Sequence, residues 1–155
     1  SDVYKRQLEK VYAAGLSLDF IVAPDIVAGG KASLDYSIEW ATGELKTAPR
    51  LALAVQDGMT PQDLVDADAF SHFSHLFVGG TLKWKWDTAS EWVDIAHQKG
   101  LKCHIGRCGQ LHHLRRAQKI KADSVDSASI ARNDSWQIIE EFIESSQMIL
   151  EIEPS

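Results

Sequence analysis

The sequence predicts an α/β fold, a partial TIM-type (β/α) barrel with about five parallel strand–helix units of the eight that close a barrel. Short apolar runs alternate along the chain with longer segments of helical periodicity. The units recur at intervals of about 25 residues, as they do in barrels. A doubly wound sheet has the same alternation, but no Gly-x-Gly-x-x-Gly motif follows any of the runs. The barrel is therefore the favoured architecture.

The strands are predicted from short, largely apolar runs, each of which stops at a glycine or a polar residue. Because most of these runs are continuously apolar, they are typical of strands that are buried on both faces of a parallel sheet. The helix that follows each run requires parallel pairing through right-handed crossovers. We expect strands over residues 20–23, 51–55, 75–78, 103–105 and 124–127.

Segments with apolar residues at helical spacing separate the strands. Ser33 is the candidate N-cap of the first helix, and Pro61 takes the first helical position of the second. Gly100 ends the third helix, and the fourth is basic and amphipathic. We expect helices over residues 33–44, 84–99, 111–122 and 136–145, and a short helix that opens at residues 60–63.

The first seven residues differ in character from the rest. The chain does not begin with Met, and residues 1–7 look like a translated sequencing adapter joined to the protein. A natural helical N-terminus is the alternative. We therefore expect a non-native segment over residues 1–7 and a partial TIM-barrel catalytic domain over residues 8–155.

The composition is that of an ordinary globular protein, with 155 residues, 45% hydrophobic and 25% charged. No apolar run approaches the roughly 18–20 residues of a membrane helix, so no membrane partner is expected. Cys103 and Cys108 are too few for a disulfide scaffold and are not spaced as a zinc knuckle, which favours a reduced, cytoplasmic setting. The histidines lack a third ligand at convincing spacing, so no metal is expected.

Positive charge is concentrated in one segment. The formal net charge of −6 argues against nonspecific binding of nucleic acid by the whole surface. Residues 99–121, however, contain seven Lys or Arg and no Asp or Glu. Such a segment is suited to a phosphate backbone, and a solvated helix face is the alternative.

Polar residues and glycines follow every predicted strand, at the edge where barrel enzymes place their active sites. A carboxylate accepts two N–H groups, a Gln both donates and accepts, and paired glycines let the backbone approach a ring. Each feature alone is weak, and a Gly-Gly pair is more often only a turn. Together they indicate a site for a flat, hydrogen-bonding ligand at strand ends that hold Asp25, Gln56-Asp57-Gly58, Gly79-Gly80, Gly106-Arg107 and Asp126, where Asp57 has no assigned role beyond bonding its own turn.

The order of these residues resembles the second half of the tRNA-guanine transglycosylase (queuine tRNA-ribosyltransferase) superfamily over about residues 18–134. Gln-Asp-Gly and Ile-Gly-Arg look closest to its deazapurine DNA modification protein A branch. The tRNA enzymes usually show Gln-Gly and Gly-Val-Gly and carry a zinc site beyond the barrel. The motifs are Ala23-Pro24-Asp25, Val55-Gln56-Asp57-Gly58, Phe77-Val78-Gly79-Gly80, His104-Ile105-Gly106-Arg107 and Asp123-Ser124-Val125-Asp126, with Arg132 following.

The resemblance implies a glycosyltransferase (a pentosyltransferase) that replaces guanine in DNA by a 7-deazaguanine such as preQ0. Asp126 would be the nucleophile and would form an aspartyl-glycosyl intermediate. Its alternative roles are a helix cap or an ion pair with Arg132. No cofactor is evident, although a zinc site outside this chain is compatible with the resemblance, and a homodimer is possible. Because the family's general base comes from an earlier strand, we expect weak or no turnover from this chain alone.

The resemblance also assigns the remaining site residues. Asp25 would read the N–H edge of the base, or be only a loop residue, and Gln56 would read its carbonyl. Ile105 would press on the face of the ring, or belong to the core. The predicted backbone and turn contacts are Gly79, Gly80 and Gly106, and the predicted nucleic-acid contacts are Arg107, Arg115, Arg116 and Arg132.

Three other functions remain open from the sequence. The first is a tRNA-guanine transglycosylase that acts on tRNA, and the second is a non-catalytic paralogue or subunit that only binds nucleic acid. The third is an unrelated barrel enzyme that holds a phosphate at Gly79-Gly80. The last function leaves Asp25 and Gln56 without a role.

Overall fold

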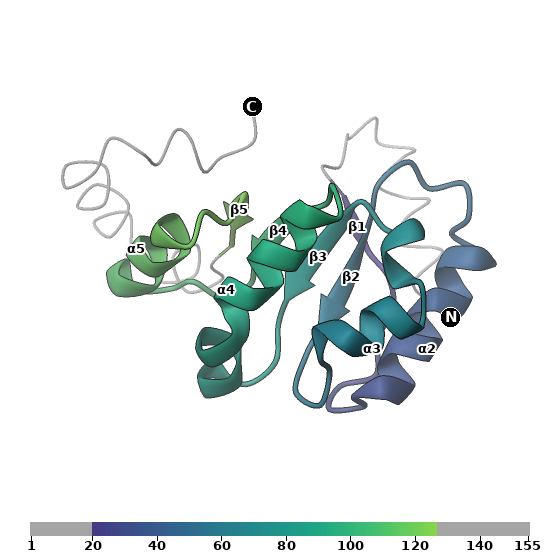
Figure 1. The fold of residues 1–155 in the computed structure, drawn as a ribbon, viewed down its shortest axis with the longest axis horizontal. Helices are drawn as coiled ribbons and strands as arrows, with labels where there is room; N and C mark the ends of the chain where they lie inside the picture. The colour runs from purple at the N-terminus through teal and green to yellow at the C-terminus, as the bar shows by residue number, and fades with distance from the viewer. Residues whose placement is uncertain (1–19, 127–155) are drawn as a thin grey trace.

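The structure, a computed structural model, describes residues 20–126. Strands and helices alternate along this part of the chain, and all five strands pair in parallel in the order β1-β2-β3-β4-β5. The elements are β1 (Ile21–Val22), α2 (Lys31–Thr42), β2 (Leu51–Val55), α3 (Pro61–Asp66), the 3-10 helix η1 (Ala69–Ser71), β3 (His75–Val78), α4 (Leu82–Gln98), β4 (Lys102–Ile105), α5 (Leu111–Lys119) and β5 (Ser124–Val125) (Figure 1).

The sequential strand order has a direct structural consequence. Each strand lies beside the previous one, so successive right-handed crossovers place all the helices on one side of the sheet. A doubly wound sheet would instead reverse its strand order near the middle and carry helices on both faces. The predicted α/β class is therefore confirmed as a curled, all-parallel sheet with helices between the strands (Figure 1).

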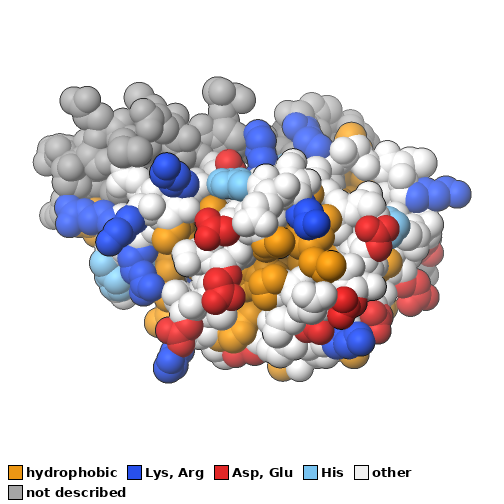
Figure 2. All heavy atoms as spheres, viewed as in Figure 1, with side chains coloured by type: hydrophobic (Ala, Val, Ile, Leu, Met, Phe, Trp, Pro, Cys, Tyr) orange, Lys and Arg blue, Asp and Glu red, His pale blue; other side chains and the backbone are white. Residues whose placement is uncertain are grey.

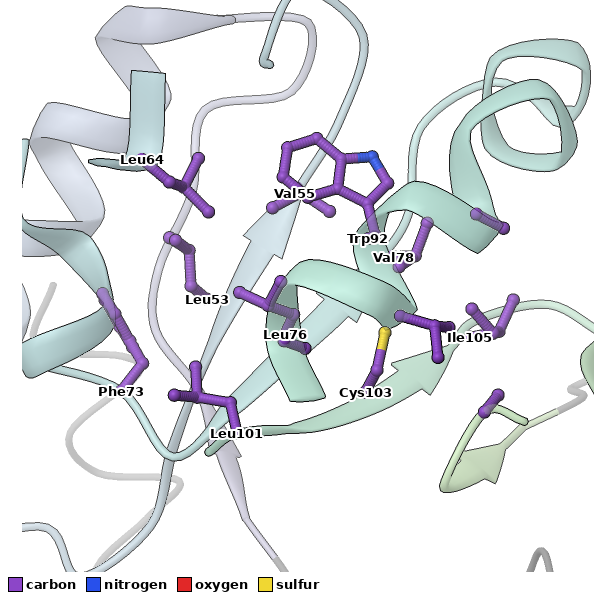
Figure 3. Close-up of a cluster of buried hydrophobic side chains, with 14 of the residues drawn as sticks. Leu53, Val55, Leu64, Phe73, Leu76, Val78, Trp92, Leu101, Cys103 and Ile105 are labelled. Carbon is purple, nitrogen blue, oxygen red and sulfur yellow. The ribbon is translucent and has the colours of Figure 1, made fainter. Parts of the chain in front are cut away.

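The hydrophobic core lies between the sheet and these helices. Alternate side chains of β2, β3 and β4 point into it, among them Leu53, Leu76 and Cys103, and Trp92 of α4 belongs to the same cluster (Figure 3). The same cluster includes residues of α2, α3 and α5. Because strand side chains alternate between faces, the residues between these core positions lie on the opposite, inner face of the sheet.

Most predicted elements agree with the structure. The strands over residues 51–55 and 75–78 have the predicted bounds, and α3 begins at Pro61 behind a capping box formed by Thr60 and Asp63. The prediction of Ser33 as an N-cap is wrong, because α2 begins two residues earlier and its N-cap is Gly30. The predictions for residues 1–7 and 136–145 lie outside the described residues.

None of the helices in residues 20–126 has the length and apolar character that a bilayer crossing requires.

Truncation of a core side chain tests this packing. Leu76→Ala removes a fully buried side chain and should lower the free energy of unfolding by about 2–5 kcal/mol, as measured by urea denaturation. The matched control is Leu82→Ala, because Leu82 is 59% exposed and its truncation should change stability by about 0.5 kcal/mol or less. Equal losses in the two variants would contradict the described core.

Candidate active site

The carboxyl ends of the five parallel strands meet at one edge of the sheet, and backbone hydrogen bonds extend the pairing one residue further. The Gly79 N–H donates to the Val55 carbonyl at 2.9 Å, and the Gly106 N–H donates to the Val78 carbonyl at 3.0 Å. The Asp126 N–H donates to the Ile105 carbonyl at 3.3 Å. Gly79, Gly106 and Asp126 therefore occupy equivalent positions on neighbouring strands. The sequence-based prediction that these strand ends come together is correct for the pairing that the structure describes.

Aromatic and polar side chains cover the inner face of the sheet just below this edge. Phe77, His104 and Ser124 are register partners across β3, β4 and β5. The rings of Phe77 and His104 are stacked, with their centroids 5.0 Å apart. The Phe77 ring also lies against Gly106, where an added Cβ would come within 2.9 Å of it. A glycine at position 106 is therefore what allows Phe77 to lie flat along the strand ends.

The predicted contact between Ile105 and the face of a base is wrong in this structure. Ile105 is fully buried in the core between the sheet and the helices (Figure 3). Its neighbour His104 points to the inner face, so alternation along β4 directs the two side chains to opposite sides. Phe77 is the large apolar side chain that does lie on the inner face beside the strand ends.

Asp126 lies at the end of β5, and further contacts hold it there in addition to the bond from its N–H to Ile105. Its Oδ2 is 2.6 Å from His104 Nε2, and its Oδ1 accepts from the Arg107 N–H at 3.1 Å. Its own carbonyl accepts from the Cys108 N–H at 2.7 Å. The side chain remains 47% exposed, so the carboxylate is fixed in position and still reachable from solvent.

The electrostatic environment keeps Asp126 ionised. Burial by itself would raise the pKa of this carboxyl group, but the hydrogen bonds from His104 and the Arg107 N–H outweigh it. The nearby positive charge of Lys85 acts in the same direction. The net result is a pKa below the ordinary value for Asp, so the group is a carboxylate at neutral pH.

Lys85 is an unexpected component of this end of the sheet. It belongs to α4, is only 1% exposed, and its Nζ donates to the Gly106 carbonyl at 2.6 Å. Burial lowers the pKa of Lys85, and the opposing effect of the nearby Asp126 carboxylate does not outweigh it. Burial also raises the pKa of the Cys108 thiol to about 12, so this group stays neutral. Lys85 is therefore a buried donor to the carbonyl of Gly106, the residue before Arg107, whose N–H bonds Asp126.

Gln56 has a different local role from the one the sequence suggested. Its Oε1 accepts from the Ala28 N–H at 2.6 Å. Its Nε2 donates to the Ile26 carbonyl and to Ser33 Oγ, both at 2.9 Å, and lies 3.3 Å from Asp25 Oδ2. Both ends of the amide are thus occupied by the loop after β1. Gln56 shapes this loop and places Asp25, which is itself exposed.

The Gly79-Gly80 turn is also engaged by the protein. The Gly79 N–H is used in the sheet, so it does not provide the predicted donor to a ligand in this structure. Asp57 accepts from both the N–H and the hydroxyl of Thr81, at 2.7 and 2.6 Å. Gly80 has a φ of +77°, and a Cβ there would come within 2.5 Å of Asp57 Oδ1. This turn fastens the end of β3 to the end of β2.

The predicted basic surface is present on α5. In Figure 2 the Lys and Arg side chains gather at the left end of the molecule, over this helix, and Arg115, Arg116 and Lys119 are exposed. Arg116 also packs on α4, since its guanidinium lies 5.0 Å from the centre of the Trp86 ring and donates to the Trp86 carbonyl. Arg107 is exposed beside Asp126. Arg132 lies outside the described residues.

Within residues 20–126, no group of three or more His, Cys, Asp or Glu is placed to hold a metal ion.

Sequence reasoning missed three residues of this site, namely Phe77, His104 and Lys85. The alternation of β3 contains the signal for Phe77, because Leu76 and Val78 are the obvious core residues on either side of it. His104 follows from the same rule applied to β4. No local pattern identifies Lys85, because a lysine in an amphipathic helix is normally exposed.

Replacement of Gln56 tests its role in the loop after β1. Gln56→Leu leaves the Ala28 N–H without its acceptor and should cost about 1–3 kcal/mol of unfolding free energy in urea denaturation. Gln62→Leu is the control, because Gln62 is exposed on α3 and bonds only across the helix to Asp66. A Gln56 variant as stable as the control would show that this hydrogen-bond network contributes little.

Comparison of the chain with protein-family models, curated proteins and solved structures finds no match. The chemistry available at the strand ends is therefore argued from the residues themselves: an ionised and accessible carboxylate, a histidine bonded to it, and an aromatic ring beside it.

Proposed function

We propose that this chain forms part of a (β/α)-barrel transglycosylase that exchanges guanine for a 7-deazaguanine in a nucleic acid, with Asp126 as the nucleophile. The observation that carries this proposal is the state of Asp126 at the end of β5. Its carboxylate is accessible, ionised and oriented by donors on both oxygens. A carboxylate in this state can form and release an ester at a sugar carbon, as in retaining glycosidases.

The proposed exchange takes place in two displacements. An Asp126 oxygen bonds to C1′ of the nucleotide while the C1′–N bond to guanine breaks, and the electron pair of that bond leaves with the base. The nitrogen of the incoming deazaguanine, after loss of its proton to a base, then bonds to C1′ while the C1′–O bond to Asp126 breaks. Two inversions retain the configuration of the sugar. The proton acceptor in this proposal comes from a strand outside the described residues.

The base would occupy the inner face near the strand ends. Phe77 takes the role that the sequence suggested for Ile105, because its ring lies along Gly79 and Gly106 on that face. Asp25 is exposed and can accept the N–H groups of a purine edge. Gln56 can reach a ligand carbonyl only if its bonds to the loop after β1 are exchanged for bonds to the ligand.

The nucleic acid would run along α5. The exposed Arg115 and Lys119 face away from the core on this helix, and the exposed Arg107 bonds Asp126 through its backbone N–H. Lysine and arginine at such positions neutralise phosphates and hold the strand in register. DNA is favoured over tRNA by the resemblance of the Gln-Asp-Gly and Ile-Gly-Arg segments to the DNA-modifying branch. Free cysteines at positions 103 and 108 are compatible with a cytoplasmic protein.

A covalent trap tests the proposal. The protein, expressed from its complete gene, is incubated with DNA or tRNA in the absence of any deazaguanine, denatured, and analysed for a nucleic-acid adduct by gel shift and peptide mass spectrometry. We expect an adduct on the peptide that contains Asp126 in the wild-type protein and none in Asp126→Asn, which keeps the size of the side chain but is a much weaker nucleophile.

The control for the trap is Asp57→Asn, which changes a carboxylate at the end of a neighbouring strand that only ties down Thr81. This variant should still form the adduct. Absence of an adduct in the wild-type protein with both nucleic acids, or an equal adduct in Asp126→Asn, would contradict the proposed function.

A further inference from the structure

We propose that His104, held in place by Ser124, is the positioning residue that orients the Asp126 carboxylate and speeds its departure from the sugar. This inference rests on the proposed function and concerns a residue to which the sequence assigned no role. It starts from a continuous chain of contacts on the inner face of the sheet. Ser124 Oγ lies 2.6 Å from His104 Nδ1, and Asp126 Oδ2 lies 2.6 Å from His104 Nε2.

The hydrogen-bonding capacities of these groups determine the direction of the chain. A carboxylate can only accept, so the nitrogen that faces Asp126 must carry a proton. In the neutral imidazole the other nitrogen is then an acceptor, and the Ser124 hydroxyl is placed to donate to it. In this form Ser124 holds the ring with Nε2 toward Asp126, as second partners of functional histidines generally do.

The His104 ring is held so that this contact is maintained. It stacks on Phe77 at 5.0 Å and meets the edge of Phe20 at 5.2 Å. The residue as a whole is buried, although Asp126 itself is half exposed. A packed ring loses little further freedom when it binds a carboxylate, so the donor is preorganised.

His104 does not exchange protons with the base in this proposal, because both of its ring nitrogens are engaged, Nε2 with Asp126 Oδ2 and Nδ1 with Ser124 Oγ. Its effect passes through the carboxylate, and it makes Asp126 a better leaving group when the ester breaks, because the N–H bond strengthens as negative charge returns to Oδ2.

Other groups also face Asp126 and remain in place when His104 is changed. They are the Arg107 N–H from the loop after β4, and Lys85 of α4 with its neighbour Cys108. Their presence predicts that the carboxylate stays ionised near neutral pH without His104, but titrates at a higher pH than in the wild-type protein.

A matched pair of substitutions separates the hydrogen bond from the packing. His104→Phe keeps an aromatic ring against Phe77 but has no donor, whereas His104→Gln places an amide donor near the position of Nε2. The control is His75→Phe, because His75 lies on the same face, packs on Phe20 and bonds Ser74 rather than Asp126. Circular dichroism and urea denaturation establish that each variant is folded.

Two readouts are then measured on the protein expressed from its complete gene. The first is the titration of the Asp126 carboxyl carbon by carbon-13 NMR, in which the pKa of Asp126 should rise in His104→Phe, be largely restored in His104→Gln and be unchanged in His75→Phe. The second is the decay of the trapped adduct when deazaguanine is added. Decay should be about tenfold slower in His104→Phe, and close to the wild-type rate in the other two variants.

The outcomes distinguish this inference from the function on which it rests. If the wild-type protein forms an adduct and His104→Phe titrates or releases it as the wild type does, the role of His104 is overturned and the proposed function stands. If the wild-type protein forms no adduct, the proposed function fails and the catalytic role of His104 fails with it. A slow His104→Phe variant that His104→Gln does not restore would also overturn the inference, because ring packing would then explain the loss.

Discussion

The pairing of β4 with β5 is the constraint on which the candidate site depends. β5 is only two residues long, and its register sets Ser124 opposite His104. Contacts on both sides of β5 hold it there. Asp123 accepts from the Cys103 N–H at 2.7 Å and from His97, and the Asp126 carbonyl accepts from the Cys108 N–H. A shift of one residue would turn Asp126 toward the core and leave His104 without a partner.

The two faces of the sheet have different roles. One face packs against the helices and forms the hydrophobic core, and the other carries the side chains of the candidate site. Leu53, Leu76 and Ile105 pack against the helices, and the large apolar area that they remove from water stabilises the fold. The opposite face carries His75, Phe77 and His104, with the Asp126 carboxylate at the end of β5. Burial of such polar groups is tolerated because each has a partner: Ser74 for His75, and Ser124 with Asp126 for His104.

The sequence predicted the elements better than the orientation of their side chains. Apolar runs bounded by polar residues located β2 and β3, because burial of a parallel strand on both faces leaves a continuous signal. The sequence leaves Ile105 open between a contact with the base and the core, and the alternation along β4 places it in the core. The start of α2 was misplaced because Gly30, with its φ of 54°, precedes the helix where a polar cap had been expected at Ser33.

Contacts between distant residues could not be predicted in this way. The bond from Gln56 to the backbone around Ile26 joins segments 30 residues apart, and the contact between His104 and Asp126 joins segments 22 residues apart. Both depend on the register of a pairing that periodicity does not specify. The buried position of Lys85 likewise depends on how α4 crosses the end of β4, where the Gly106 carbonyl offers it an acceptor. These long-range contacts fix the positions and hydrogen-bond partners of the polar side chains at the strand ends.

A double-mutant cycle on His104 and Asp126 tests this account most directly. Unfolding free energies of His104→Phe, Asp126→Asn and the double variant are compared with that of the original chain by urea denaturation at neutral pH. The structure predicts a coupling free energy of about 0.5–3 kcal/mol between the two side chains, as for residues in direct contact. Additive effects of the two substitutions would show that the carboxylate and the imidazole do not interact, and would contradict the described pairing of β4 with β5.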